Sequence, residues 1–269
     1  MKGLYVAGML FLYLYTPLAF SSTEIIKFGA NESPPYWSSM LEKQGMCGEI
    51  MHAISKVANL KAEIEFTPLK RLIDDDNNND LGNPEFYMKI QEFASIVPIA
   101  IYRVNVVYYR PNHKEEIKIS SLDDLKGYKI GVIQGVLTEQ AYFKNAGITF
   151  ETSYTEDSLI KKVKRGRVDL VLSIDLVAQS SIKKLYPNEI GDFEFIDVAG
   201  STSPIALMIS ENHPNAKSIG KEFSAGLNEV IKSGAYKRIL EKYYGVGKIP
   251  NGWFDELNKF QRLYDFHSE

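Results

Sequence analysis

Several residue types and motifs that mark particular chemistries are scarce or absent. The 269-residue chain contains one cysteine, Cys47, which excludes an internal disulfide and a paired-cysteine zinc or redox site. Its four histidines are scattered, with no HExxH or i, i+4 pair that would favour a metal site. No GxSxG, P-loop or GxGxxG pattern occurs. We therefore expect Cys47 to be a small buried residue, and we expect no metal, no organic cofactor and no enzymatic activity.

A surplus of positive charge is also lacking. The chain has 31 Lys and Arg residues against 34 Asp and Glu residues, for a formal net charge of −3. This balance excludes a nucleic-acid binder that relies on a basic face, because no excess of cations is available to neutralise phosphates. Hydrophobic residues make up 45% and charged residues 24%, the ordinary mixture of a globular protein with a buried core.

Long apolar runs are missing except at the N-terminus. Lys2 is followed by an uncharged apolar stretch from Gly3 to Leu14, then by Pro17 and by small residues up to Ser21. This pattern predicts a cleaved signal peptide over residues 1–21, with an uncleaved membrane anchor as the alternative. We expect a soluble mature chain in the periplasm.

The mature chain alternates between strand and helix patterns, which indicates a mostly parallel sheet covered by helices. Two such α/β units follow one another, and the segment after Gly200 has a strand and two helices without a sheet of its own. Strands are predicted at 24–29, 62–66, 93–100, 104–109, 129–133, 168–174, 193–198 and 205–209, and helices at 48–60, 121–125, 138–145, 158–164, 216–233 and 236–244.

The economical arrangement returns the segment after Gly200 to the first unit. Two extended segments, 104–110 and 203–210, then cross between the units. The sequence therefore predicts a two-lobed α/β clamp with two hinge crossings. Lobe 1 comprises 22–111 plus 199–269, and lobe 2 comprises 112–198.

Six motifs, taken in their order along the chain, resemble the family 3 periplasmic solute-binding proteins, the amino-acid type of ABC-transporter binding proteins. The resemblance implies a type II periplasmic-binding-protein (Venus-flytrap) fold that closes by hinge motion on a small molecule. The motifs are PPY at 34–36, PLKR at 68–71, GVIQG at 131–135, GRVDLVLSID at 166–175, LNEVIKSG at 227–234 and ILEKYYG at 239–245.

The resemblance also implies how the ligand is held. An acidic residue at the position of Asp175 usually receives the ligand's α-ammonium; the alternative for Asp175 is an N-cap before Leu176. The position of the family's carboxylate-binding arginine falls on Lys89, which lacks the planar fork of arginine and is otherwise a plain surface lysine. Arg71 and Arg103 are further candidates for the anion contact.

Other parts of the resemblance concern a helix start and aromatic side chains. Thr138, shortly after Gln134, stands where the family often has Gly-Thr-Thr at a helix start whose amides hold an anion, and a helix cap is its alternative role. Aromatic pairs at 36–37 and 86–87 are candidates for a ligand platform, with plain packing as the alternative. The ligand-binding candidates are Tyr36, Trp37, Arg71, Glu85, Tyr87, Lys89, Gln134, Thr138 and Asp175.

We interpret the chain as a periplasmic protein that captures a small, amine-bearing, amino-acid-like ligand for an ABC transporter. Its expected partners are that ligand and a membrane permease or receptor, with no nucleic acid, and the expected state is a monomer. A transporter-independent sensor that presents its closed form to a membrane receptor is the alternative. A remote alternative is a cyclohexadienyl-dehydratase-like enzyme, with Glu85 and Asp175 as cleft carboxylates. The tract from Asp74 to Glu85 only partly matches a calcium loop, because Asn79 replaces its glycine.

Overall fold

The computed structural model describes residues 25–68, 71–72, 79–89, 91–134, 148 and 150–265. The predicted signal peptide (1–21) and the predicted helix at 138–145 lie outside the described residues, as do residues 74–78 of the calcium-loop-like tract. Within the described residues, no helix combines the length and the apolar character needed to cross a membrane.

Eight strands form one mixed sheet in the order β2-β1-β3-β8-β4-β7-β5-β6. The pairs β1–β2, β1–β3, β5–β6 and β5–β7 are parallel, whereas β8 is antiparallel to β3 and β4, and β4 is antiparallel to β7. The strands are β1 (Ile25–Ala30), β2 (Lys61–Phe66), β3 (Asp80–Gly82), β4 (Phe93–Tyr109), β5 (Ile130–Ile133), β6 (Phe150–Ser153), β7 (Leu170–Ile174) and β8 (Phe193–Ser210).

Helices follow the strands much as the hydrophobic patterns predict. The α-helices are α1 (Gly45–Ala58), α3 (Pro84–Tyr87), α5 (Glu156–Lys164), α6 (Asp175–Leu185), α7 (Ala216–Lys232), α8 (Ala235–Tyr244) and α9 (Trp253–Asp265). Short 3-10 turns lie at η1 (Glu42–Gln44), η2 (Arg110–Asn112), η3 (Leu122–Leu125) and η4 (Ile190–Asp192). Among the strands and α-helices, β3, β6, α3, α6 and α9 have no counterpart among the predicted elements.

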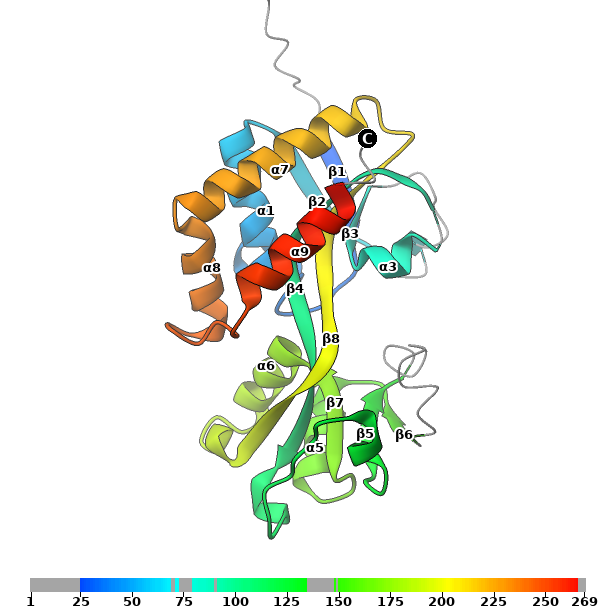
Figure 1. The fold of residues 1–269 in the computed structure, drawn as a ribbon, viewed down its shortest axis with the longest axis vertical. Helices are drawn as coiled ribbons and strands as arrows, with labels where there is room; N and C mark the ends of the chain where they lie inside the picture. The colour runs from blue at the N-terminus through cyan, green and yellow to red at the C-terminus, as the bar shows by residue number, and fades with distance from the viewer. Residues whose placement is uncertain are drawn as a thin grey trace, which may run out of the picture.

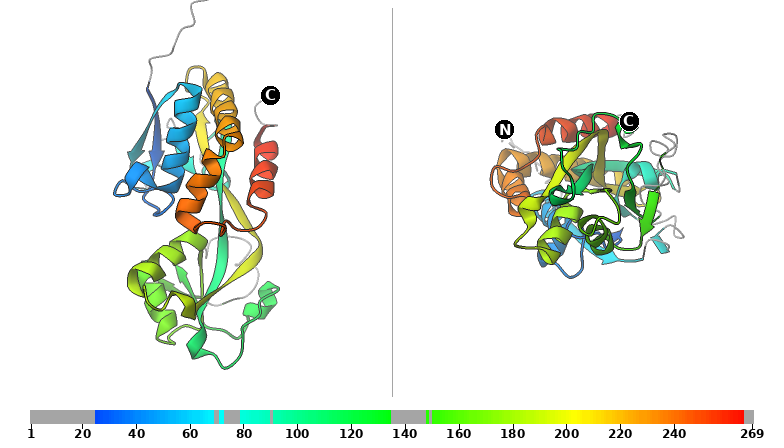
Figure 2. Two further views of the ribbon diagram at one scale, coloured as in Figure 1. Left: turned by 90° about the vertical axis from the view of Figure 1, so that its left-hand side faces the viewer. Right: turned by 90° about the horizontal axis from the view of Figure 1, so that it is seen from below.

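The long strands β4 and β8, of 17 and 18 residues, run through the whole molecule and join an upper half to a lower half (Figures 1 and 2). We use "upper half" for the part with β1–β3, α1, α3 and α7–α9, and "lower half" for the part with β5–β7, α5 and α6. The two strands pair from Phe93–Ser210 at one end to Tyr109–Phe193 at the other. The halves are therefore connected by a paired β-ribbon.

Each half has its own hydrophobic core. Along β4 the buried side chains belong to the upper core up to Ile101 and to the lower cores from Val104 onward. Along β8 the change falls between Val198 and Ile205. Leu176, at the start of α6, packs with the upper core although its helix lies in the lower half. The lobe boundaries at 111 and 199 stay a prediction. The change from one core to the other along β4 and β8 indicates where the ribbon passes between the halves.

Candidate functional site

The carboxyl ends of parallel strands mark the edge where ligands bind in open α/β sheets. In the lower half, β7 ends at Ile174 and Asp175 follows directly as the first residue of α6. In the upper half, Tyr36 lies in the loop that follows β1. These two residues, far apart in sequence, meet where the halves face each other, so we place the candidate site around Asp175.

Asp175 is a buried carboxylate that connects the two halves. Only 3% of the residue is exposed. Its Oδ1 accepts a hydrogen bond from the Tyr36 hydroxyl at 2.5 Å, and its Oδ2 accepts one from the Tyr244 hydroxyl at 2.8 Å. The backbone N–H groups of Leu176 and Arg103 also act on this carboxylate and lower its pKa. Each of the two carboxylate oxygens therefore already accepts one hydroxyl from the upper half.

The electrostatics of the Asp175 cluster follow from burial. Desolvation raises the pKa of the Asp175 carboxyl above its ordinary value, while the hydroxyls of Tyr36 and Tyr244 and the two N–H groups act in the opposite direction. Burial, followed by the charge of Asp175, holds the pKa of both tyrosines well above the usual range. The tyrosines therefore remain neutral donors at physiological pH.

Asp175 does not take the alternative role of helix N-cap that the sequence analysis left open. The helix α6 begins at Asp175 itself, Ile174 occupies the N-cap position, and no side-chain cap bond is present there. The carboxylate instead lies in the first turn, where the partial positive charge of the helix N-terminus favours its ionised form.

Tyr36 is held by the backbone of its own loop. Ser33 and Trp37 exchange backbone hydrogen bonds of 2.8 and 3.0 Å, which closes the turn. The carbonyls of Pro35 and Tyr36 then accept from the first N–H groups of α1, at Met46 and Cys47, at 2.9 and 3.0 Å. The loop thus caps α1 in place of a side chain.

Gly45 permits this close approach of the loop to α1. Its φ is +92°, and a Cβ at this position would lie 2.6 Å from the Pro35 carbonyl oxygen. A larger residue at position 45 would therefore displace the loop that carries Tyr36.

Tyr244, the last residue of α8, was missed by sequence reasoning as a site residue. The buried residues Tyr236, Leu240 and Tyr244 recur every four positions along α8, a pattern that indicates a core-facing helix side but not a polar role. The Tyr244 ring packs edge-on against Trp253 with centroids 5.4 Å apart. The Trp253 Nε1 donates to the Tyr236 hydroxyl at 3.3 Å, and that hydroxyl donates to the Ile99 carbonyl at 2.7 Å. The Tyr244 ring therefore packs against a Trp253 side chain that is itself held by hydrogen bonds in the core.

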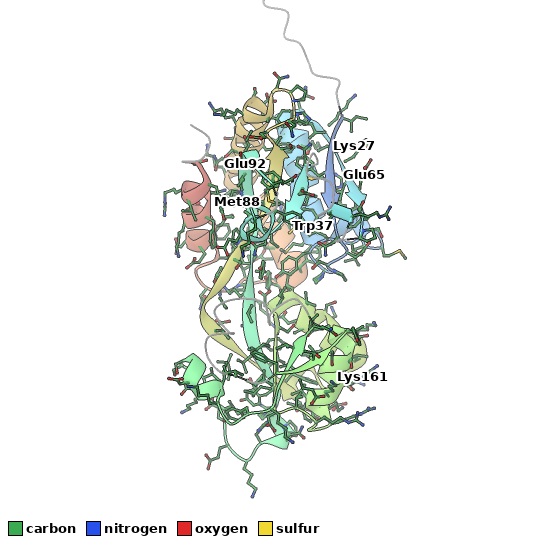
Figure 3. All side chains as sticks on the ribbon, turned by 90° about the vertical axis from the view of Figure 1, so that its right-hand side faces the viewer. Lys27, Trp37, Glu65, Met88, Glu92 and Lys161 are labelled. Atoms are coloured by element: carbon green, nitrogen blue, oxygen red, sulfur yellow. The ribbon has the colours of Figure 1, made fainter. Side chains whose placement is uncertain are left out.

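The other aromatic candidates lie in the upper core. Tyr36 and Trp37 are 2% and 3% exposed, so they form part of the packing and not an open platform. Figure 3 shows the position of Trp37 in the upper half. Its Nε1 has no hydrogen-bond partner among the described residues. Tyr87 is also buried, with its ring 2.8 Å from where a Cβ on Gly82 would lie.

The charged and polar candidates are dispersed. Arg71, Glu85, Lys89 and Gln134 are all exposed, and no ion pair links any of them to another described residue. The Glu85 backbone N–H donates to the Asn83 side chain at 2.8 Å. Thr138 lies outside the described residues. Their ligand-binding roles, including Lys89 in place of the family's arginine, stay predictions.

Arg103 lies on β4 at the passage between the halves. Its guanidinium donates to the Asn251 carbonyl at 2.6 Å, and its Nε has no partner among the described residues. Its side chain therefore ties the ribbon to the loop before α9, while its backbone N–H faces Asp175.

Glu156 is a second carboxylate near this edge that sequence reasoning missed, and it is partly buried. It is the first residue of α5, directly after the N-cap Thr155, where an acidic residue is ordinarily just a helix-start signal. Burial raises its pKa to about 7, despite an opposing contribution from the Ser173 side chain. Its Oε1 is enclosed and has no hydrogen-bond partner among the described residues. A carboxyl with this pKa changes its charge near neutral pH.

The cysteine of the chain lies in the core of the upper half. Cys47 is fully buried and free, as predicted, and burial holds the pKa of its thiol well above the usual value. In the part of the chain that the structure describes, no group of three or more His, Cys, Asp or Glu side chains is placed to hold a metal ion. The arrangement at Asp175 is suited to hydrogen bonding and to charge recognition.

Comparisons with known proteins agree with this architecture. No family profile matches the chain. The arginine-binding extracellular protein ArtP of Bacillus subtilis (strain 168) is 26% identical over 148 residues, which is 51% of this chain. The match spans about half of that relative, 54% of its length.

Two solved structures cover more of the chain. An ancestral arginine-binding protein bound to arginine is 25% identical, with a TM-score of 0.58 over 82% of this chain and 98% of its own. The arginine-, lysine-, histidine-binding protein ArtJ of Geobacillus stearothermophilus is 19% identical, with a TM-score of 0.60 over 87% of this chain and 100% of its own. The predicted two-lobed fold and the resemblance to the solute-binding family are confirmed.

Proposed function

We propose that this chain, which has the fold of the type II periplasmic-binding proteins, captures a small amine-bearing, amino-acid-like solute between its halves. We further propose that it works in the periplasm as the binding component of an ABC transporter. The resemblance of its motifs to the family 3 solute-binding proteins and its similarity to arginine-binding proteins support this function.

One observation carries the proposal. Asp175 brings a buried negative charge to the edge where the strands of the lower half end, and it contacts the upper half through Tyr36 and Tyr244. An ammonium group suits such a site, because a charge-assisted hydrogen bond is strong where water is excluded. The ligand's ammonium takes the place of at least one tyrosine hydroxyl, because each oxygen of this buried carboxylate is covered by one of them.

Ligand capture is thereby coupled to the arrangement of the halves. Replacing a tyrosine donor on Asp175 changes a contact between the upper and lower halves, so a bound ligand favours a different relative position. The ligand supplies the difference in free energy between the two states through its contacts with both halves.

A thermal-shift screen of residues 22–269 tests the proposal, with amino acids, amines, sugars and small carboxylates as probes. A ligand at about 100 times its Kd adds about 2.7 kcal/mol to the unfolding free energy, a rise of several degrees for a chain of this size. We expect the shift with α-amino acids or amines, and sugars or simple carboxylates as the sole hits would contradict the proposal.

A matched pair of variants ties the shift to Asp175. Asp175→Asn removes the charge with little change of shape, and Asp123→Asn does the same at a side chain that is 80% exposed. We expect Asp175→Asn to lose the ligand-induced shift, measured from its own unfolding temperature, and Asp123→Asn to retain it. A full shift in Asp175→Asn would remove Asp175 from the ligand site.

A further inference from the structure

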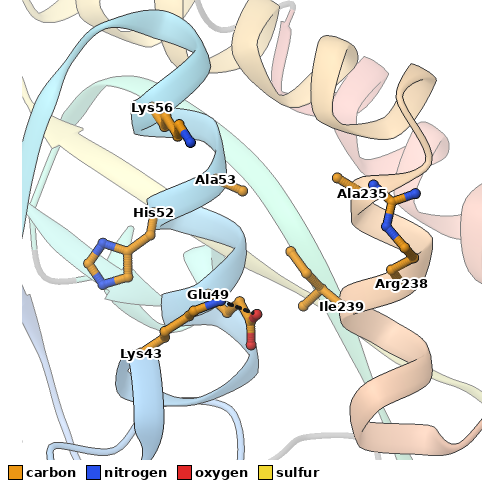
Figure 4. Close-up of a pocket in the computed structure, with 8 residues that line it drawn as sticks. All are labelled: Lys43, Glu49, His52, Ala53, Lys56, Ala235, Arg238 and Ile239. Atoms are coloured by element: carbon orange, nitrogen blue, oxygen red, sulfur yellow. Dashed lines mark hydrogen bonds and ion pairs between the residues drawn. The ribbon is translucent and has the colours of Figure 1, made fainter.

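A second candidate binding site lies in the upper half, between α1 and α8. A groove of about 440 Å³ opens there, and none of the residues of the Asp175 cluster line it (Figure 4). Its sides carry Lys43, Glu49 and Lys56 from η1 and α1, and Arg238 from α8, while Ala53 and Ile239 provide an apolar floor. The chemistry of this groove differs from that of the proposed ligand site, because cations predominate.

The one carboxylate in the groove is already neutralised. The Glu49 side chain is 11% exposed, and its two oxygens accept from Lys43 at 2.7 Å and from Lys242 at 2.9 Å. Both cations contact this one carboxylate, and Lys242 also pairs with Glu42 at 3.6 Å. Together Lys43 and Lys242 lower the pKa of the Glu49 carboxyl against the effect of its burial. Glu49 is therefore not free to offset further positive charge in the groove.

The remaining cations have no such partner. Lys56 and Arg238 are both exposed and form no ion pair with any residue between 25 and 265 that the structure describes. Figure 4 shows them on the two helices that flank the groove. His52, beside them, adds no charge at neutral pH, because burial and the neighbouring Lys43 lower its pKa.

The size of the groove indicates the kind of anion that fits it. A volume of about 440 Å³ falls within the range of organic-ligand pockets, roughly 300–1,000 Å³, and far exceeds one inorganic anion. The floor of Ala53 and Ile239 offers apolar contact that an inorganic anion cannot use. A peptide segment that carries a carboxylate on an aliphatic stem satisfies both features.

We propose that the groove between α1 and α8 is a docking site for an acidic segment of a protein partner, with Lys56 and Arg238 as its recognition residues. The groove has more cations than acids along its sides, although the chain as a whole has a net charge of −3. Contacts between exposed charges mainly favour encounter and orientation, so the complex is weak and sensitive to salt. The proposal does not depend on which solute the Asp175 site binds.

The test measures the fluorescence anisotropy of a labelled Glu- and Leu-rich peptide titrated with residues 22–269. Lys56→Gln combined with Arg238→Gln is compared with Lys161→Gln combined with Lys183→Gln, which removes the same charge from exposed positions in the lower half. We expect the first pair to weaken binding by roughly 2- to 30-fold, and the second pair to leave it unchanged. Affinity should fall as the Debye length drops from about 30 Å to about 8 Å between about 0.01 and 0.15 M salt.

Three outcomes would overturn the proposal. They are equal losses in the two double variants, no binding of the peptide at low salt, and displacement of the peptide by inorganic phosphate at unchanged ionic strength. The last result would identify a site for small anions. The thermal shift with amino acids is recorded for the same variants, and it should be unaffected, so the two proposals are tested separately.

Discussion

Replacement of Tyr244 by phenylalanine isolates the contribution of one hydroxyl to the contact between the halves. The ring, which packs edge-on against Trp253 at 5.4 Å, stays in place, so the change removes only the hydrogen bond of 2.8 Å to Asp175. The hydrogen bond from Tyr36 to the other carboxylate oxygen remains. The variant therefore leaves one acceptor site of a buried carboxylate unsatisfied.

The expected loss follows from the charge and burial of Asp175. A hydrogen bond to a charged group contributes about 1.5–3 kcal/mol, and the site is only 3% exposed, so water cannot readily replace the hydroxyl. We expect Tyr244→Phe to lower the free energy of unfolding by about 1.5–3 kcal/mol at neutral pH. For a chain of this length the unfolding temperature should fall by about 3–12 °C.

The effect should also depend on pH in a defined direction. Burial already raises the pKa of Asp175 in the folded state, so protonation relieves a cost of folding, and the group favours folding more as pH falls through that pKa. The Tyr244 hydroxyl stabilises the ionised form, and its removal raises the pKa further. The difference in stability between parent and variant should therefore shrink as pH decreases.

Urea unfolding at neutral pH and at about pH 4 measures this difference. Tyr243→Phe is the matched control, because it removes a hydroxyl from the adjacent residue, which is only partly buried and does not contact Asp175. A Tyr244→Phe protein as stable as Tyr243→Phe would refute the role assigned to this hydrogen bond. A deficit that grows in acid would refute the assignment of Asp175 as ionised at neutral pH.

Three other predictions concern single side chains. The pKa of Glu156 is raised from 4.5 to about 7, so Glu156 makes the protein less stable as pH rises through that window. In chemical unfolding at pH 8, Glu156→Gln should raise the free energy of unfolding by about 3 kcal/mol. A pH profile of stability like that of the parent would contradict this. Gly220→Ala should lower the unfolding free energy by about 1–3 kcal/mol, because the new Cβ would lie 2.3 Å from the Ser95 hydroxyl oxygen. Gly191→Ala is the control and should have no effect, because no atom lies within 4 Å of the position of its Cβ. Cys47 should react with a thiol reagent only after unfolding, and rapid reaction in the native protein would show that its burial is wrong.

The fold was largely predictable because local patterns and packing agree. The predicted strand at 24–29, helix at 48–60 and strand at 62–66 correspond to β1, α1 and β2, whose apolar spacing matches their burial. The predicted crossings correspond to β4 and β8, but both strands are longer than predicted. Two prolines lie within the ribbon: Pro98 pairs with Ala206 and Pro204 with Ile101, with a register shift beside Pro98.

The candidate site was less predictable because it depends on contacts between distant segments. Asp175 and Tyr36 were both identified, yet their mutual hydrogen bond joins residues 139 positions apart. Tyr244 carried only the signature of a buried helix face, and Glu156 only that of a helix start. For Trp37 and Tyr87 the sequence left a ligand platform and plain packing open, and both side chains are buried in the core.

The paired ribbon has a consequence for synthesis and for engineering of the chain. In the upper half, β8 lies between β3 and β4. The upper half of the sheet therefore lacks its middle strand until the ribosome has synthesised residue 210. The lower half is one uninterrupted stretch, and it can complete its core first as the chain emerges. Since Arg103 pairs with Thr202, the polypeptide leaves and re-enters the upper half at adjacent points. The lower half is thus an insertion between the upper parts of β4 and β8, which are paired like the strands of a β-hairpin. A short turn that joins Arg103 to Thr202 would leave the strand order of the upper half unchanged.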